Sequence, residues 1–173
     1  MWVPTVSVLE RIIEAGADTA AAVGERIQLH PPALPSVSVD EPDRLVLTTF
    51  EAGGLPGRRS ETTLLGRREV AVVDPGDASD TAIDAIRSAV ERRNGHVTAI
   101  VLTATDPDHA AGAEALAIPL EVPVLVPHGA GRHLPYDVVE LADGDRLPID
   151  IDVRVRLGPG PTLSVDPAPS AGE

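Results

Sequence analysis

The chain has 173 residues, of which 43% are hydrophobic and only 2% aromatic, and it carries 14 Lys and Arg against 27 Asp and Glu. This length suits one domain, or a small domain with an appended segment, and the aliphatic content is sufficient for a packed core. The net charge of −13 and the shortage of aromatic rings argue against a nucleic-acid partner or an anionic membrane, since both need cationic or stacking surfaces. The absence of cysteine removes disulfides, thiolate metal ligands and cysteine nucleophiles.

The first 42 residues contain a predicted helix followed by a predicted linker. Apolar residues recur at helical spacing within residues 5–23, and Ser7 with Glu10 fits a capping box. Repeated prolines between His30 and Pro42 exclude a continuing helix, so we interpret this stretch as an extended linker that ends at a domain boundary. The start lacks the cationic and apolar runs of a signal peptide, and no stretch approaches the ~20 apolar residues that span a bilayer. We therefore expect a soluble cytoplasmic protein.

Strands and helices are predicted to alternate from residue 43 to residue 162, which is typical of an α/β domain. The strongest predicted helix, residues 79–94, has an apolar stripe, and Asn94-Gly95 supplies a left-handed stop. In Asp74-Pro75-Gly76 we expect Gly76 to take the positive φ of a type II turn. Residues 163–173 are interpreted as a disordered tail because of their composition. The predicted strands are 44–50, 61–65, 69–73, 97–102, 123–126, 138–141 and 149–157, with a short helix at 109–117.

The most informative stretch is Thr103-Ala104-Thr105-Asp106-Pro107-Asp108-His109, which follows a predicted buried strand and opens the short helix. It resembles the metallo-β-lactamase superfamily, whose signature at this junction is Thr-His-x-His-x-Asp-His. In that family the tight loop lets imidazoles and a carboxylate converge on zinc. Bound zinc lowers the pKa of a water molecule and so yields a hydroxide nucleophile. The resemblance implies an αββα-type fold, in which a mixed sheet has flanking helices and this chain forms one half.

Three further motifs extend the resemblance over roughly residues 45–162, in the order found in the family. Asp74-Pro75-Gly76 looks like the end of the family's early hairpin, where the aspartate orients the metal-binding loop. Residues 110–126 look like the helix and strand that follow the signature. Gly158-Pro159-Gly160-Pro161-Thr162 looks like the family's later Pro-Gly-His-Thr loop.

Several metal ligands of the family pattern are missing from this chain. Carried over by position, Ala104 and Asp106 replace the two early histidines, and Pro161 replaces the later one. Asp108 and His109 are retained. The resemblance therefore implies at most one weakly bound zinc ion, held by Asp106, Asp108 and His109, and otherwise no cofactor. A catalytic role, if one persists, falls to Asp108.

Structural roles explain most of the same residues without a metal. Asp106 followed by Pro107 fits a helix N-cap with proline at the first helical position. Asp108 is favoured in a first helical turn by the helix dipole. Asp74 fits a turn, and an isolated loop histidine such as His128 is usually solvated. Solvated loop charges are also expected at the four arginines Arg58, Arg59, Arg67 and Arg68.

The N-terminal segment carries a second resemblance, because Trp2-Val3-Pro4 and His30-Pro31-Pro32 are similar to the end of some Nudix-type domains. Three hypotheses follow for the whole chain. It is a metal-dependent hydrolase of a small-molecule substrate that is weakly active or inactive in isolation, a non-catalytic binding or dimerisation module, or a fragment of a larger Nudix–metallohydrolase fusion. Since half of the fold alone would expose an apolar sheet face, we expect a homodimer or a partner chain to cover that face.

Overall fold

The computed structural model describes residues 34–55, 57–160 and 162–167. The chain divides into two units, Met1–Pro31 and Pro32–Glu173, and all described residues belong to the second. The helix predicted for residues 5–23 and the Nudix-like segment lie outside the described residues. No helix in the described part of the chain is long and apolar enough to cross a membrane.

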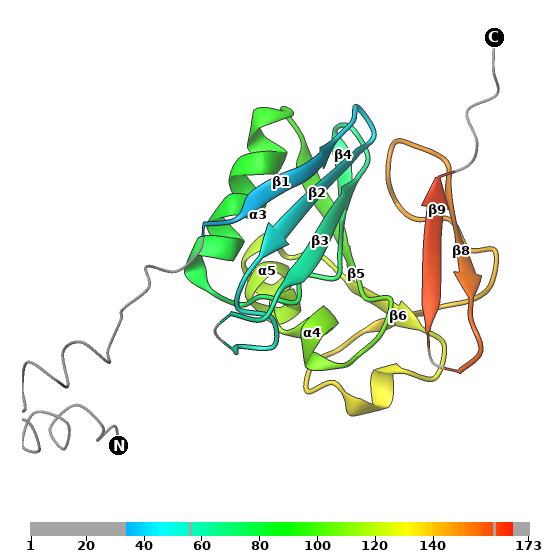
Figure 1. Ribbon diagram of the computed structural model, residues 1–173. Coiled ribbons are helices and arrows are strands. Elements are labelled where there is room, and N and C mark those ends of the chain that lie inside the picture. Colours follow the sequence, from blue (N-terminus) through cyan, green and yellow to red (C-terminus); the bar gives the residue numbers. More distant parts are fainter. Residues whose placement is uncertain (1–33, 56, 161, 168–173) are drawn as a thin grey trace, which may run out of the picture. The chain divides into compact units, whose positions relative to one another are not determined.

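A seven-stranded mixed sheet forms the centre of the second unit (Figure 1). The strands lie in chain order from one edge to the other, antiparallel from the first to the fourth and parallel from the fourth to the seventh. Helical segments connect the parallel strands, as parallel pairing requires. The predicted α/β class with a mixed sheet is thus confirmed. The strands are β1 (Ser36–Asp40), β2 (Arg44–Thr49), β3 (Ser60–Leu65), β4 (Glu69–Val73), β5 (His96–Val101), β6 (Val124–Pro127) and β7 (Val139–Leu141).

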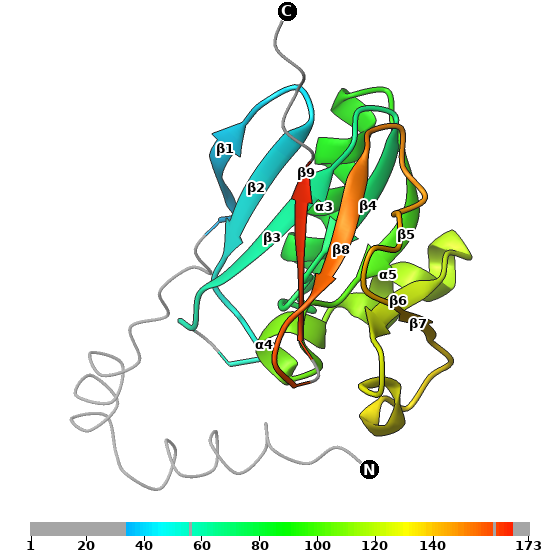
Figure 2. The same cartoon turned by 90° about the vertical axis from the view of Figure 1, so that its right-hand side faces the viewer.

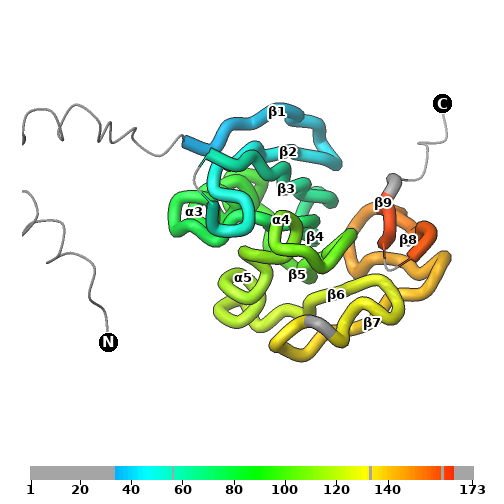
Figure 3. Tube along the Cα trace, turned by 60° about the horizontal axis from the view of Figure 1, so that its bottom comes forward, coloured from blue at the N-terminus to red at the C-terminus, as the bar shows by residue number. Residues whose placement is uncertain are grey.

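Helices α3 (Asp80–Arg92) and α5 (Ala113–Leu120) cover one face of this sheet, and Figure 3 shows both on the same side. The apolar stripe of α3, formed by Ile83, Ile86 and Val90, packs in one core cluster with residues of β4, β5 and β6. Burying each such aliphatic side chain contributes about 1.5–3 kcal/mol. The short helix α4 (Pro107–Ala110) follows β5, and the 3-10 helix η1 (Gly131–His133) follows β6.

Both ends of α3 have the local signals that the sequence predicted. The Ser79 hydroxyl accepts a hydrogen bond from the Ala82 N–H at 3.3 Å, which caps the start of the helix. Asn94 has a φ of 52°, and the next N–H, that of Gly95, donates to the Val90 carbonyl at 3.1 Å. This is the hydrogen-bond pattern of a Schellman motif, so the predicted left-handed stop is confirmed.

A two-stranded antiparallel ribbon, β8 (Val153–Leu157) and β9 (Leu163–Pro167), covers the other face of the sheet (Figure 2). Val153, Val155 and Leu163 are buried in a second core cluster that also contains sheet residues such as Val101. Arg154 and Arg156 alternate with these valines and are exposed. The prediction that an apolar face of the sheet is exposed is therefore wrong. The reason for expecting a homodimer or a partner chain to cover that face is removed with it.

Two predicted boundaries also need correction, because the domain extends further at both ends. Residues 36–40, interpreted as linker, form β1 and pair with β2, and the Ser38 hydroxyl donates to the Val46 carbonyl. Residues 163–167, interpreted as disordered tail, form β9 and pair with β8. Proline at Pro35 and Pro42 flanks β1 without entering it, which is the position where an edge strand tolerates proline.

Candidate functional site

The candidate site lies where the parallel strands β4 and β5 end, and α4 packs at this edge of the sheet (Figure 3). Leu102, directly after β5, is fully buried, so the loop that begins at Thr103 starts from a fixed position. The loop after β4 and the loop after β5 meet here because parallel strands present their carboxyl ends on one side. Edges of this kind position ligand and catalytic groups in α/β proteins.

Asp74 organises the loop that follows β5. Its carboxylate accepts a hydrogen bond from the Thr103 N–H at 2.7 Å and another from the Thr103 hydroxyl. The same carboxylate lies 3.0 Å from Nδ1 of His109. Asp74 adopts a φ of 52°, so Asp74, and not Gly76 as expected, takes the left-handed conformation in this turn. The structure thus places Asp74 where it orients both the loop and the imidazole.

His109 faces two carboxylates from its two ring nitrogens. Nδ1 lies against Asp74, and Nε2 lies 3.8 Å from an oxygen of Asp106. The hydrogen bond with Asp74 raises the pKa of His109; burial lowers it, and the negative charges of Asp74, Asp106 and Asp108 add to the rise. The side chain remains 38% exposed, so the imidazole is accessible from solvent.

Asp106 acts as the N-cap of α4. Its carboxylate accepts from the Asp108 N–H at 3.2 Å, and Pro107 occupies the first helical turn. This is the capping role that the sequence suggested as the alternative to metal binding. The carboxylate is therefore engaged with backbone, which is the common use of aspartate at this position.

Asp108 forms an ion pair with Arg58, a residue that the sequence assigned to solvated loop charges. Arg58 belongs to the glycine-rich loop between β2 and β3. That loop is fixed near the site because the Gly53 N–H donates to the Gly76 carbonyl at 2.7 Å and the Glu51 N–H donates to Asp77 at 2.9 Å. A guanidinium thus neutralises the one carboxylate that the family pattern retains as a ligand.

Two contacts hold the backbone carbonyl of Asp108 close to Ser60 of β3 and to Gly76 in the turn after β4. The Ser60 hydroxyl donates to the Asp108 carbonyl at 3.1 Å. Gly76 packs directly against the same carbonyl, and a Cβ atom at Gly76 would overlap it. Gly76 is therefore required by close approach of two backbone segments, and not by a positive φ.

The remaining predicted residues lie elsewhere or carry no ligand atom. Ala104 offers only a methyl group, and Pro161 lies outside the described residues. The start of β9 does reach the site, since the Leu163 N–H donates to the Thr103 carbonyl at 3.0 Å. His128 lies 2.9 Å from Glu140 of β7 and is largely exposed. The side chain of Arg67 pairs with Asp43, and the backbone N–H groups of Arg67 and Arg68 donate to Asp150.

The described residues contain no group of three or more His, Cys, Asp or Glu arranged to hold a metal ion. Asp106 caps a helix, Asp108 is paired with an arginine, and both ring nitrogens of His109 face carboxylates, with Nε2 the more distant at 3.8 Å from Asp106. This donor set does not fit the three-ligand or four-ligand zinc sites of proteins. Asp74, by contrast, holds Thr103 by two hydrogen bonds, which is consistent with the predicted role of orienting this loop.

Sequence reasoning missed two residues of the site, Arg58 and Asp77. Asp77 is buried and accepts from the N–H groups of Glu51 and Ser79, both at 2.9 Å. The sequence could have identified Asp77 by its position between the Asp74-Pro75-Gly76 turn and the N-cap of α3. Arg58 had no such local signal, because its partner is 50 residues away in the sequence.

Several solved structures share this fold. VMB-1 at pH 5.5 has 12% identity and a TM-score of 0.62, over 76% of this chain and 64% of that chain. The metallo-beta-lactamase from Pontibacter korlensis has 14% identity and a TM-score of 0.62, over 77% and 66%. ETHE1 from Myxococcus xanthus has 18% identity and a TM-score of 0.54, over 70% and 53%. The chain thus spans less than two thirds of each of these proteins, and at such identities the likeness concerns the fold.

No curated protein matches the chain in sequence. The metallo-beta-lactamase superfamily does match, over residues 55–171. This range begins in the loop that carries Arg58, includes Asp74, the Asp106–His109 loop and the β8–β9 ribbon, and covers more than half of the chain. The chain therefore belongs to the metallo-β-lactamase superfamily.

Proposed function

We propose that this chain is a metallo-β-lactamase-fold protein with a degenerate metal site, which is weakly active or inactive as a hydrolase in isolation. The ion pair between Asp108 and Arg58 carries this proposal. In the family pattern Asp108 is a metal ligand, and a metal ion there would have to displace a guanidinium of the same chain. Ala104, which stands at a histidine position, offers no compensating donor atom.

The proposal allows at most one weakly held zinc ion per chain. Asp108 and His109 are the residues that would hold it, with Asp106 as a third, poorly placed oxygen ligand. Zinc binding would require Asp106 to leave its capping position and Asp108 to leave Arg58, so each ligand would be taken from an existing partner. Residual activity on a small-molecule substrate is expected to depend on Asp108, with His109 beside it.

Calorimetric titration with zinc tests this proposal directly. We expect weak or no binding by the natural sequence, and tighter binding by the double variant Ala104→His, Asp106→His, because the flanking strand and helix already fix the loop. Adding Arg58→Ala to the double variant should tighten binding further, since it frees the Asp108 carboxylate. Arg59→Ala is the matched control, because Arg59 is exposed and adjacent to Arg58 but forms no ion pair within the described residues.

Two results would contradict the proposal. Two zinc ions per chain that survive dialysis of the natural protein would show that the ligand assignment is wrong. Equal zinc affinity in the natural protein and the double variant would show that residues 103–109 do not form the family's metal-binding loop. The cytoplasmic location stays a prediction, and fractionation of cells that produce the tagged protein would test it.

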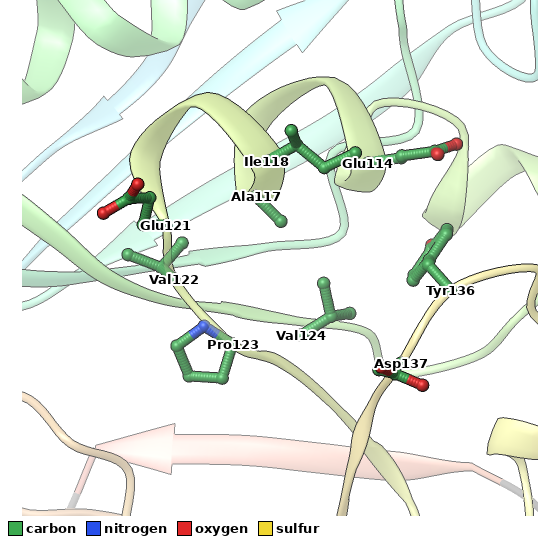
Figure 4. Close-up of a pocket in the computed structure, with 9 residues that line it drawn as sticks. All are labelled: Glu114, Ala117, Ile118, Glu121, Val122, Pro123, Val124, Tyr136 and Asp137. Atoms are coloured by element: carbon green, nitrogen blue, oxygen red, sulfur yellow. The ribbon is translucent and has the colours of Figure 1, made fainter.

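The alternative function is that of a non-catalytic binding module, and a pocket on the helical face favours it. The pocket lies along α5 (Figure 4) and shares no lining residue with the candidate site. Binding of a ligand there without turnover, together with absence of metal, would support this alternative over a hydrolase.

A further inference from the structure

The turn that ends α3 contains the single asparagine of the chain, Asn94, and glycine follows it. Asn94 is exposed and takes a φ of 52°, so water reaches its side-chain amide. An asparagine before glycine is chemically labile, because glycine has no side chain that hinders its backbone nitrogen from reaching the neighbouring amide carbon. The turn therefore contains a reactive pair that the candidate site does not use.

The fold favours both residues of this pair. Asn94 supplies the left-handed conformation that ends the helix, which few residues other than glycine adopt readily. Gly95 lies close to the turn between β3 and β4, where a Cβ atom would come within 3.1 Å of the Arg68 carbonyl oxygen and 3.3 Å of the Arg67 carbonyl oxygen. The labile pair is thus a consequence of how α3 ends and how its end packs.

Backbone hydrogen bonds hold the pair in an unreactive arrangement. The Gly95 N–H donates to the Val90 carbonyl at 3.1 Å, and the His96 N–H donates to the Arg68 carbonyl at 2.7 Å. Reaction requires the Gly95 nitrogen to lose its proton and to approach the Asn94 side chain. The turn must therefore open before the reaction proceeds, and such local opening is a property of helix ends.

Arg93 fastens the same turn to its surroundings. Its side chain is only 15% exposed, and its guanidinium donates to the Gly66 carbonyl at 3.4 Å, to the Glu41 carbonyl and to an Asp40 carboxylate oxygen at 3.3 Å. These partners belong to the β1–β2 and β3–β4 connections. Arg93 therefore opposes opening of the turn without contacting the reacting atoms.

We propose that Asn94 is a deamidation site whose rate is controlled by opening of the turn that ends α3. In the open turn, hydroxide removes the proton from the Gly95 nitrogen, and this nitrogen attacks the side-chain carbonyl carbon of Asn94. The new bond closes a succinimide ring. The bond from that carbon to the amide nitrogen breaks, and the nitrogen leaves with a proton from water as ammonia. Water then opens the ring at either carbonyl and leaves aspartate or isoaspartate, so no other reactant is needed.

The two products differ in their effect on the fold. Aspartate keeps the length of the main chain but places a negative charge at the C-terminus of α3, where the helix dipole disfavours anions. Isoaspartate adds a methylene group to the main chain and so displaces Gly95 and His96 from their hydrogen-bond partners. Because His96 begins β5 and pairs with Glu69 of β4, we expect the isoaspartate form to melt at a lower temperature than the aspartate form.

Peptide mapping by mass spectrometry tests the proposal on the full chain at mildly alkaline pH, folded in buffer and unfolded in guanidinium chloride. Deamidation adds one mass unit at Asn94, and fragmentation distinguishes isoaspartate from aspartate. We expect the reaction in both states, slower in the folded protein by about fivefold or more, because the Gly95 hydrogen bond must break first. Asn94→Gly, which keeps a left-handed residue but cannot react, should retain its melting temperature through the same incubation, whereas that of the natural protein falls.

A pair of arginine variants tests the control by the turn. Arg93→Ala should raise the folded rate by about threefold or more and leave the unfolded rate within about twofold, since it removes contacts made only in the folded state. Arg92→Ala is the matched control, because Arg92 is exposed and forms no ion pair with a described residue, and it should change neither rate.

Three outcomes would overturn the proposal. Absence of the mass gain at Asn94 in the unfolded chain would show that the pair is not reactive. A folded rate equal to or above the unfolded rate would show that the turn does not control the reaction. Equal effects of Arg93→Ala and Arg92→Ala on the folded rate would also contradict this control. The site shares no residue with the metal-binding positions, so these results do not depend on zinc binding.

Discussion

Asp74 is the residue through which β4 and the loop after β5 are connected. It accepts two hydrogen bonds from Thr103 and lies against His109, all from a backbone position with a φ of 52°. Aspartate tolerates this left-handed conformation better than most residues, which explains why it occupies a position that combines a turn with three polar contacts. The same side chain therefore determines both the backbone path and the orientation of the imidazole.

Replacing Asp74 with alanine should lower the free energy of unfolding by about 1–3 kcal/mol, because the Thr103 N–H would remain half-buried without its acceptor. The measurement is urea denaturation of the two proteins. Asp74→Asn is the control, since an amide oxygen retains one acceptor and should retain part of the stability. An unchanged midpoint for the alanine variant would count against this role.

Asp77 is a buried charge that connects three segments, and it makes stability depend on pH. Burial alone would raise the pKa of Asp77, but hydrogen bonds from Ser79 and Glu51 outweigh it and hold the pKa below its usual value. A lowered pKa in the folded state means that the stabilisation is complete above the unfolded pKa of about 3.9. It is lost as the pH falls through the lower folded pKa.

Asp77→Asn should therefore be less stable than the natural protein by about 1–3 kcal/mol at pH 7, and this difference should shrink below about pH 4. Urea titrations at pH 7, 4 and 3 measure it. A difference that stays constant over this range would mean that the charge of Asp77 contributes nothing. Asp84→Asn, on the exposed side of α3, controls for the loss of one negative charge.

At the scale of elements, the turn after β4 and the start of α4 depend on backbone contact. A Cβ atom at Gly76 would overlap the Asp108 carbonyl oxygen, and the Gly112 N–H donates to the Pro75 carbonyl at 2.6 Å. The turn and the helix therefore fit together only without a side chain at residue 76. This contact, together with the hydrogen bond from Ser60, determines where Asp108 meets Arg58.

Gly76→Ala should separate the turn from α4, with a loss of about 2 kcal/mol or more, because the obstructing atoms are backbone and overpacking of this kind is costly. Gly158→Ala is the matched control, since its nearest neighbour is the flexible Thr162 hydroxyl and its φ is not in the left-handed region. Thermal unfolding of both variants gives the comparison. Similar melting temperatures for the two would show that the turn moves aside without cost.

The elements that the sequence predicted correctly are those whose signals are local. The stripe and caps of α3 and the continuous apolar run of β5 depend on residues within one segment. β1 and β9 were missed because both strands are short and polar at alternate positions, and because β1 follows a proline and β9 ends in one. Their sequences are Ser-Val-Ser-Val-Asp and Leu-Ser-Val-Asp-Pro. Pairing with β2 and β8 stabilises them, and a single sequence does not show that pairing.

The residues of the candidate site also fall into two groups, those with a signal in the sequence and those without one. The capping role of Asp106 was visible as Asp-Pro before a helix, and the family resemblance identified Asp74, Asp108 and His109 as neighbours. The ion pair with Arg58 was not visible, since it depends on a loop folded back by the Gly53 and Asp77 contacts. Long-range electrostatic partners of this type require the tertiary structure.

At the largest scale that the structure describes, the second unit of the chain, three layers enclose two separate cores. Helices α3 and α5 cover one face of the sheet, and the β8–β9 ribbon covers the other. An isolated two-stranded ribbon is marginally stable, so this one depends on its valines packing against the sheet. The ribbon in turn protects sheet residues such as Ala71 and Val101 from water.

Val155→Gln should release the ribbon and expose this sheet face, because a fully buried valine would be replaced by a polar side chain without partners. We expect a loss of about 2–4 kcal/mol and self-association at high concentration. The adjacent Arg156→Gln, on the exposed side of the same strand, should change neither property. Light scattering and urea denaturation distinguish the outcomes, and a monomeric, stable Val155→Gln protein would contradict the role of the ribbon.

Under the proposed degenerate site, Arg58 takes the place of a metal ion beside Asp108, so we expect the free energy of unfolding to depend little on the zinc concentration. A site filled from solution gains stability in proportion to the logarithm of free ligand, and loses it when a chelator removes that ligand. The Arg58–Asp108 pair, exposed on both sides, contributes little by comparison, about 0–1 kcal/mol, and that contribution does not depend on the zinc concentration. We therefore expect urea denaturation midpoints that are the same with added zinc and with a chelator, and a midpoint that falls on chelation would contradict the proposed site.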